Sequence, residues 1–214
     1  MKKPKACIID FSTNNLLSIE RAIKFVGFDT TIINEKCDIA AYDLVILPGV
    51  GAFNNVMKQI RNSGIIDVIE QVLTLKKNLL SICLGMQILY EESSELGHSK
   101  GIGFFKGKVE NFKKSSSQFN TFVGWNNIEF NDQIFNKNTL SLEKNLINSS
   151  YYFVHSCYVE SKNKDLVKGI SYNGDTPFAS IVAKDNVIAT QFHPEKSGKN
   201  GIRFLEKILK PIIS

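Results

Sequence analysis

Short apolar runs alternate with stretches of helical periodicity through the first half of the chain, and this rhythm limits the possible folds more than any other feature. The expected strands are residues 6–11, 30–34, 44–47 and 79–83, and the expected helices are residues 15–26, 65–77 and 85–92. Strands that are joined by helices run parallel in a sheet that is covered on both faces. The sequence therefore predicts an α/β fold with a mainly parallel central sheet flanked by helices.

The second half changes character, because short strand-like segments with turn signals between them replace the helices. These segments are residues 109–112, 119–123, 151–155, 166–172, 179–184 and 186–192. Asp185 and Asn186 predict a hairpin turn, and residues 201–210 predict a closing helix that Pro211 ends. We therefore expect a mixed or antiparallel β extension of the sheet, within one domain over residues 1–214.

The composition is that of an ordinary globular protein and argues against several function classes. Hydrophobic residues make up 43% of the chain, enough to bury a core without disulfide or metal staples. The net charge of +5 comes from scattered lysines, whereas a nucleic-acid binder has a concentrated basic stripe. No run has the length of a membrane span, and the basic start lacks the apolar segment of a signal peptide. We expect a cytoplasmic protein that binds neither nucleic acid nor membrane.

The four cysteines do not form CxxC pairs, and none stands at zinc-ligand spacing from a histidine. Cys7 and Cys157 lie inside apolar runs and are expected in the core. Cys83 differs, because it stands between a strand and a helix in the sequence LLSICLGMQ. A nucleophile elbow has this form, with small neighbours such as Ser81 and Gly85, and the positive end of a helix favours a thiolate. A buried structural cysteine is the alternative interpretation.

Two further motifs can complete an active site around Cys83. In QFHPEKSG, His193 can take and return a proton, and Glu195 can orient its ring across the rigid Pro194. In LPGVGAF, a glycine turn after a strand can aim backbone N–H groups at an oxyanion. Alone, HPE can be a surface feature and the glycine turn a plain turn, which lacks the GxGxxG of a dinucleotide site. Together the motifs favour a Cys-His-Glu triad.

The motifs PGVGAF, CLGMQ and HPEKSG stand in the order and at the spacing of the class I glutamine amidotransferases, which the chain resembles over almost its whole length. The stretches GWN, YYFVHS and QFHPEKSG resemble, within that family, the glutaminase subunits of imidazole glycerol phosphate synthases. The resemblance implies a flavodoxin-like fold, glutamine as substrate, and a (β/α)8 cyclase subunit as heterodimer partner. The partner would receive the ammonia for histidine biosynthesis. No cofactor and no metal are implied.

The resemblance also implies roles for individual residues. Cys83 would attack the glutamine amide, His193 would shuttle the proton and Glu195 would orient the imidazole. The oxyanion hole would use the N–H groups of Leu84 and Val50, the second after a flip of the Gly49-Val50 peptide. Expected contacts to glutamine are Gly49, Gly51, Gln87, Glu95 and Ser156, and expected interface residues are Asn15, Trp125, Tyr152, His155 and Lys196. Trp125 has an alternative interpretation as a packed core indole.

Three places depart from the family pattern, and none touches the triad. The first loop has Ser12 and Asn14 where the family has glycines, residues 121–123 read TFV where the family has Pro-His-Met, and Ser81 replaces a glycine. The first two lie where the partner should dock. They leave open a paralogue that feeds ammonia to a sugar amidotransferase in surface-glycan synthesis. A non-catalytic binding subunit and a free-standing cysteine hydrolase are the alternatives from other classes.

Overall fold

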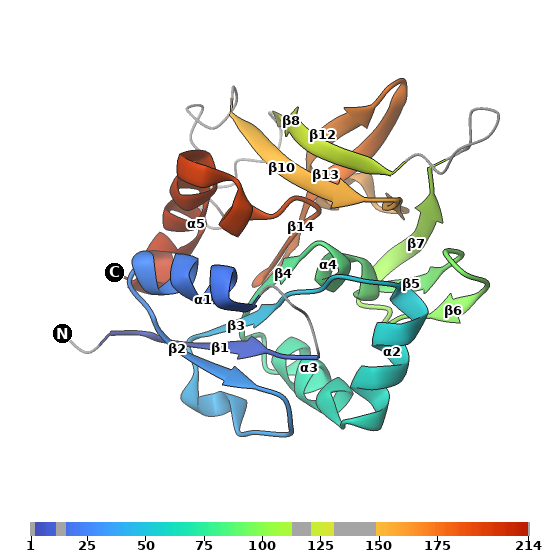
Figure 1. Cartoon of the computed structure of the whole chain (residues 1–214). Helices are drawn as coiled ribbons and strands as arrows, with labels where there is room; N and C mark the ends of the chain where they lie inside the picture. Colours follow the sequence, from blue (N-terminus) through green and yellow to red (C-terminus); the bar gives the residue numbers. More distant parts are fainter. Residues whose placement is uncertain (1–2, 12–15, 113–120, 131–148, 214) are drawn as a thin grey trace.

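The computed structural model describes residues 3–11, 16–112, 121–130 and 149–213. An eight-stranded sheet in the order β2-β1-β3-β4-β14-β13-β12-β9 forms its centre (Figure 1). A two-stranded sheet, β10-β8, and a four-stranded sheet, β11-β7-β5-β6, lie beside it. The strands of the central sheet are β1 (Lys5–Ile9), β2 (Asp29–Ile33), β3 (Leu44–Leu47), β4 (Asn78–Ile82), β9 (Glu129–Phe130), β12 (Val167–Asn173), β13 (Thr176–Lys184) and β14 (Val187–Thr190).

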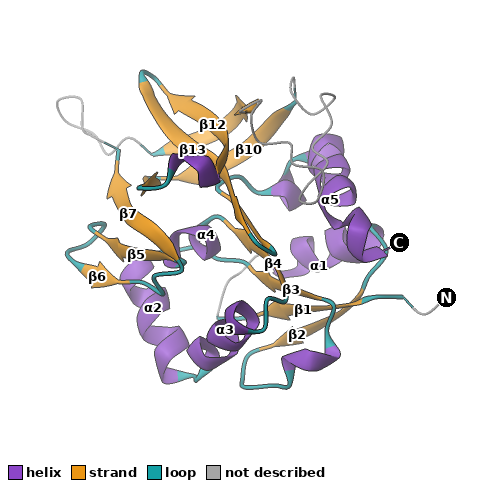
Figure 2. Ribbon diagram, turned by 180° about the vertical axis from the view of Figure 1, so that it is seen from behind, coloured by secondary structure: helices purple, strands orange, loops and turns teal. Residues whose placement is uncertain are grey.

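One half of the central sheet is parallel. Neighbouring strands in the run β2-β1-β3-β4-β14 all pair in parallel, an order of the flavodoxin type. Helices α1 and α5 cover one face of this half, and α2 and α3 cover the other (Figures 1 and 2). The helices are α1 (Leu16–Phe25), α2 (Phe53–Asn62), α3 (Ile65–Thr74), α4 (Leu84–Ile88) and α5 (Gly198–Ile213).

Two hydrophobic clusters, one on each face, hold the parallel strands. Ala6 and Ile8 of β1 belong to the cluster under α1 and α5, whereas Cys7 and Ile9 belong to the cluster under α2 and α3. All four are fully buried, because successive side chains of a strand point to opposite faces and both faces are covered. This explains the continuous apolar runs of the sequence and confirms that Cys7 is a core residue. Cys157, at 2% exposure, is likewise confirmed in the core.

The other half of the central sheet is antiparallel and continues the parallel half. β13 turns back from β14 through Asp185 and Asn186, with Lys184 paired to Val187 and a φ of 52° at Asp185. The predicted hairpin is therefore confirmed. The predicted fold class, a mainly parallel sheet with helices and a mixed β extension, is also confirmed. The strands of the smaller sheets are β5 (Tyr90–Ser93), β6 (Ser99–Lys100), β7 (Phe105–Asn111), β8 (Phe122–Asn127), β10 (Ser150–His155) and β11 (Cys157–Ser161).

The predicted helix over residues 85–92 is wrong in its second half. α4 ends at Ile88, and Tyr90–Ser93 forms β5, which pairs in parallel with β7. Tyr90 is fully buried and its ring lies against Phe105, with centroids 5.3 Å apart. Pairing with a strand more than ten residues away overrides the local helical pattern here, because one buried aromatic pair outweighs the small differences in helix propensity.

Two helices, α2 and α5, also differ from expectation. The turn expected at residues 47–53 leads into α2, which is not among the predicted helices, although its buried residues Phe53, Val56, Met57 and Ile60 have helical spacing. The prediction that Pro211 ends the last helix is wrong, since α5 continues to Ile213. Pro211 stands in the final turn, where the missing N–H removes one hydrogen bond, and Ile212 continues the packing onto the core.

The carboxyl ends of β3, β4 and β14 lie at the same edge of the sheet, because the three strands are parallel neighbours. The residues that follow these strands are the glycine turn 48–51, Cys83, and the segment from Gln191 to His193. Segments far apart in the sequence therefore meet at one edge, the usual place for a ligand site in such a sheet. Within the described ranges, no helix has the length and apolar character to cross a membrane.

Candidate active site

Cys83 occupies a strained turn between β4 and α4. Its φ of 54° and ψ of −110° lie outside the regions that L residues favour, as in a nucleophile elbow. The strain is tolerated because both flanking elements are buried. Gly85 lies so close to β3 that a Cβ atom there would stand 1.9 Å from the Leu47 carbonyl oxygen. The glycine is therefore required by the approach of the elbow to the neighbouring strand.

A cavity of about 270 Å³ opens beside the Cys83 sulfur. Together with Cys83, it is lined by seven residues that are predicted for the site or the partner interface: Val50, Gly51, Leu84, Gln87, Glu95, His155 and Ser156. Glu95 is held in place by the Phe53 N–H at the start of α2, which donates to its Oε2 atom at 2.7 Å. The cavity has the size and the mixed lining that suit an amino-acid-sized ligand. No cluster of metal-ligating side chains occurs among the described residues.

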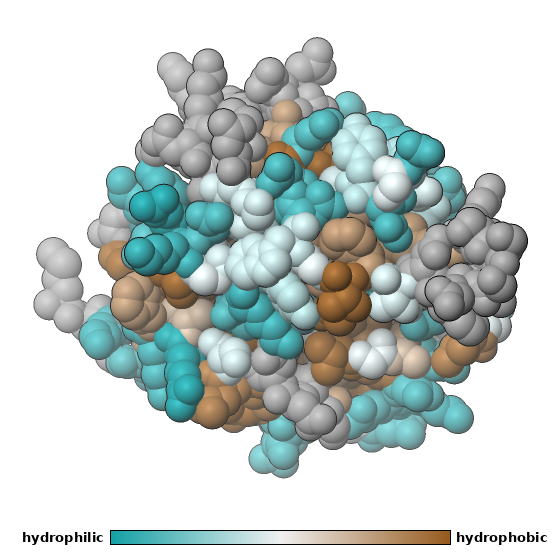
Figure 3. Space-filling model, turned by 45° about the horizontal axis from the view of Figure 1, so that its top comes forward, coloured by the Kyte–Doolittle hydropathy of each residue, from teal (hydrophilic) through white to brown (hydrophobic). Residues whose placement is uncertain are grey.

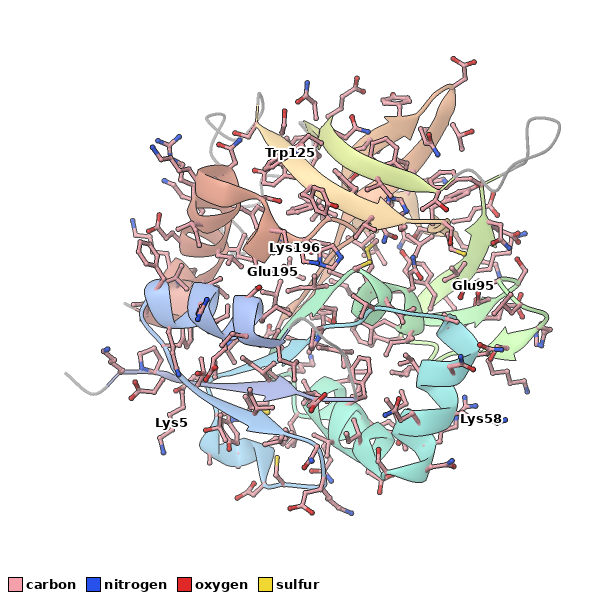
Figure 4. The ribbon with its side chains drawn as sticks, in the orientation of Figure 1. Lys5, Lys58, Glu95, Trp125, Glu195 and Lys196 are labelled. Atoms are coloured by element: carbon pink, nitrogen blue, oxygen red, sulfur yellow. The ribbon has the colours of Figure 1, made fainter. Side chains whose placement is uncertain are left out.

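His193 and Glu195 form a buried pair after β14. The His193 Nδ1 atom lies 2.8 Å from Glu195 Oε1, and the two side chains are 2% and 1% exposed. The turn that carries them is tied down on both sides. Ser197 Oγ donates to the His193 carbonyl at 2.6 Å, and a Cβ on Gly201 of α5 would stand 1.8 Å from the Pro194 carbonyl oxygen. Pro194, between the two residues, thus packs against α5. Figure 4 labels the neighbouring Glu195.

Charges on both sides of the His193 ring control its protonation. Burial alone would lower the pKa of His193, but the negative charge of a Cys83 thiolate and the Glu195 carboxylate together raise this pKa to about 10. The Nε2 atom is buried and has no hydrogen-bond partner among the described residues, so it is available for a group that enters beside Cys83. An imidazolium in this position can donate a proton to a leaving amine, and the neutral ring can accept one.

The peptide of the glycine turn presents its carbonyl to the elbow. The Leu84 N–H donates to the Gly49 carbonyl oxygen at 3.3 Å. The amide that the sequence analysis assigned to the oxyanion hole is therefore already bonded in this conformation. A Cβ on Gly49 would stand 2.8 Å from both the Gly85 nitrogen and the Leu84 Cβ, so Gly49 is needed for the close approach. A flip of the Gly49-Val50 peptide would put the Val50 N–H where the Gly49 carbonyl oxygen now lies.

The residues expected at a partner interface lie in different places. Trp125 is 56% exposed on β8, which is against its interpretation as a core indole, and its ring meets Tyr152 of β10 edge-to-face at 6.0 Å. Lys196 is exposed beside Glu195 (Figure 4). His155 is 6% exposed and lines the cavity. Asn15 lies outside the described residues. Figure 3, which brings the top of Figure 1 forward, shows white and brown side chains next to teal ones near the middle of the view.

His155 is a buried neutral imidazole among aromatic rings. Its Nδ1 atom lies 2.9 Å from the Cys157 carbonyl oxygen, which can only accept, so Nδ1 carries the hydrogen. Burial, the largest cause, lowers the pKa of His155 to about 4, and the charge of His193 acts in the same direction. The rings of Phe112, Phe153 and Phe178 lie around it at 5.0 to 5.8 Å.

This burial predicts a loss of stability in mild acid. The unfolded chain takes up the His155 proton near pH 6.5 and the folded chain only near pH 4, so folding stability falls as the pH drops between these values. The contribution is about 2 kcal/mol at pH 5. We expect His155→Phe to remove this part of the slope. Urea unfolding at pH 7 and pH 5 measures it, and an equal loss in the wild type and the variant would contradict the assignment.

Gln191 lies in the site but is not among the residues predicted from the sequence. It is fully buried, and its Nε2 atom lies 3.6 Å from the Cys83 sulfur. The only signal in the sequence is a polar residue directly after the apolar strand β14, two positions before His193. Such a residue has no motif of its own, and its contact with Cys83 spans more than one hundred positions.

Comparison with known proteins identifies the family of this chain. The family model for class I glutamine amidotransferases matches residues 7–210. Imidazole glycerol phosphate synthase subunit HisH of Caldanaerobacter subterraneus is 38% identical over 93% of this chain and 94% of its own length. The subunit named HisH 2 of Methanococcus maripaludis is 41% identical over 95% of this chain and 98% of its own.

A solved structure shares the fold at low sequence identity. The structure of PurLQS from Thermotoga maritima has a chain that matches with a TM-score of 0.75 and 20% identity, covering 99% of this chain and 100% of that one. At this identity the match shows the fold alone. The family match and the HisH relatives carry the assignment further. The chain belongs to the class I glutamine amidotransferase family and, within it, to the HisH subunits.

Proposed function

We propose that the chain is the glutaminase subunit of an imidazole glycerol phosphate synthase. It hydrolyses glutamine to glutamate and ammonia in a single domain over residues 1–214, without a cofactor, in the cytoplasm. A (β/α)8 cyclase subunit takes the ammonia for histidine biosynthesis. The observation that carries the proposal is the cavity over Cys83, with the His193–Glu195 pair at 2.8 Å beside it. The names of the HisH relatives support the choice of pathway.

The proposed reaction has two halves. The Cys83 sulfur attacks the side-chain amide carbon of glutamine, and His193 passes a proton to the nitrogen, so that the C–N bond breaks and ammonia leaves. A glutamyl thioester remains. Water then attacks the same carbon while the now neutral His193 accepts its proton, and the C–S bond breaks to give glutamate and free Cys83. Glu195 holds Nδ1 of the imidazole through both halves.

The remaining cavity residues bind the substrate and its oxyanion. Leu84 and Val50 stabilise the oxyanion with their N–H groups once the Gly49-Val50 peptide has turned. In the conformation seen here, the Gly49 carbonyl competes for the Leu84 N–H, which would keep the isolated subunit slow. Glu95 binds the α-ammonium of glutamine, because it is the acidic side chain in the cavity lining. Gly51, Gln87 and Ser156 complete the contacts to glutamine.

The partner docks on the face that carries Trp125, Tyr152 and Lys196, with His155 beneath it. Asn15, which lies outside the described residues, remains an expected contact of the partner. Exposed aromatic side chains are typical of interfaces. Val123, from the segment that departs from the family pattern, is 59% exposed on the same strand as Trp125. This departure on the expected docking face supports a second candidate, a copy of the subunit that feeds ammonia to a sugar amidotransferase.

The first experiment measures glutamate release by the chain alone and with the cyclase subunit of the same organism and its nucleotide ligand. We expect a large stimulation by the cyclase subunit. We expect Trp125→Ala to weaken that stimulation while labelling of Cys83 by a glutamine-like electrophile continues. Leu75→Ala is the matched control, since Leu75 is 59% exposed before β4, at the opposite edge of the sheet. No stimulation of a protein whose Cys83 is labelled would favour the sugar pathway.

A further inference from the structure

A chain of buried amides runs from the backbone of β11 to the Cys83 sulfur. Gln87 Nε2 donates to the Cys157 carbonyl oxygen at 3.0 Å and to Gln191 Oε1 at 3.1 Å. Gln191 Nε2 then lies 3.6 Å from Cys83 Sγ. Gln191 is fully buried and Gln87 is 4% exposed, so neither amide exchanges these partners for water. Because water does not compete, each of these hydrogen bonds helps to hold the two side chains in place.

The Cys157 carbonyl fixes which group donates and which accepts along these buried amides. A backbone carbonyl can only accept, so Gln87 must turn its NH₂ group toward Cys157. The second hydrogen of that NH₂ group then points at Gln191, which must present its carbonyl oxygen. Gln191 has only its own NH₂ group left for the sulfur. The Cys157 carbonyl thus makes Gln191 a donor toward Cys83, and the reverse orientation would break two buried hydrogen bonds.

The usual sources of thiolate stabilisation at an elbow are weak here. α4 has five residues, so its dipole is small, and the Leu84 N–H is bonded to the Gly49 carbonyl oxygen. The Cys83 N–H donates to the Thr190 carbonyl oxygen at 2.7 Å and is therefore not available to the sulfur. The titratable groups around the sulfur are His193 after β14, with Glu195 bonded to its Nδ1 atom, and His155 of β10 and Glu95 in the cavity wall.

We propose that Gln191 is a hydrogen-bond donor that stabilises the Cys83 thiolate, and that Gln87 is the positioning residue that presents its N–H to the sulfur. The role serves the glutaminase reaction and rests on that proposed function, but the contact itself is a property of the resting protein. It complements His193, because an amide donates at every pH. The His193 Nε2 atom donates only when the ring is an imidazolium, since the hydrogen of the neutral ring is on Nδ1, which faces Glu195.

The test is the pH dependence of Cys83 alkylation by iodoacetamide, followed by mass spectrometry of the peptide that contains Cys83. Gln191→Met keeps the length of the side chain and removes the donor. We expect it to raise the pH midpoint of alkylation by about one unit, with a tenfold lower rate well below the midpoint and an unchanged rate above it. Gln87→Met should shift the midpoint in the same direction by less, since Gln191 remains but is free to rotate.

Ser180→Ala is the matched control. The Ser180 carbonyl accepts from the Gln191 N–H at 2.9 Å, but its hydroxyl bonds to Ser171 and takes no part in the amide chain. We expect this variant to leave the midpoint unchanged. If Gln191→Met fails to fold, the Gln87→Met profile decides the question. An unchanged midpoint, or a rate lowered equally at every pH, would overturn the proposal.

The outcome separates this inference from the proposed function. Alkylation needs no glutamine and no partner, so a shifted midpoint supports the donor even if the chain never releases glutamate. Conversely, a wild type that hydrolyses glutamine together with a Gln191→Met variant of unshifted midpoint would leave the glutaminase standing and refute the role of Gln191.

Discussion

Cys83→Ala and Cys83→Gly are both expected to lower glutamate release by about 10⁴-fold or more, because the nucleophile of the reaction is gone. The two variants are expected to differ in stability. Cys83 has a φ of 54° and a ψ of −110°, a conformation that alanine holds under strain and glycine adopts freely. We expect the Gly variant to be more stable than the Ala variant by about 1 kcal/mol, or about 3 °C in Tm.

The pair of variants separates chemistry from strain. Glutamate release is measured with the partner present, and thermal unfolding is measured on the subunit alone. The Ala variant controls for the loss of the thiol, since it removes the sulfur and keeps the Cβ atom and its strain. Residual activity in either variant would contradict the assignment of Cys83. Equal Tm values would show that the elbow is not strained, even where the chemistry is lost.

The parallel half of the fold could be predicted because its signals are local. Strands buried on both faces are continuous apolar runs, and Leu44–Leu47 begins and ends where the sequence places it. The strands of the smaller sheets depend on distant partners. Tyr90–Ser93 becomes β5 because β7 pairs with it, and nothing within those residues distinguishes the strand from a further turn of helix.

The site also has features that the sequence predicts and features that it does not. Cys83 and His193 follow strands that the sequence predicts, and parallel strands bring their carboxyl ends together, so the proximity of the two residues follows from topology. The orientation of the Gly49-Val50 peptide does not, because a glycine permits either direction at little cost. The contact of Gln191 with the sulfur also depends on how Gln87 and the Cys157 carbonyl are placed, and these come from other elements.

Gly85→Ala is expected to destabilise the protein by about 4 kcal/mol, although alanine is the better helix former. Gly85 lies in α4, where the gain in helix propensity would be about 1 kcal/mol. Against this, the new Cβ would stand 1.9 Å from the Leu47 carbonyl oxygen and 3.3 Å from the Pro48 carbonyl oxygen. Both contacts are backbone atoms of a buried strand and its turn, which no rotamer change can relieve. Urea unfolding measures the free energy.

Gly64→Ala is the matched control, because Gly64 has a φ of 74° and open space around its Cα. It carries the cost of a left-handed alanine without a clash, about 1 kcal/mol. A similar loss in both variants would mean that the elbow moves away from β3 without resistance. That movement would also widen the gap between Gly49 and Leu84, whose hydrogen bond spans the same contact. The stability of the elbow and the hydrogen bond that closes the oxyanion hole therefore both depend on the close approach of Gly85 to the backbone of β3.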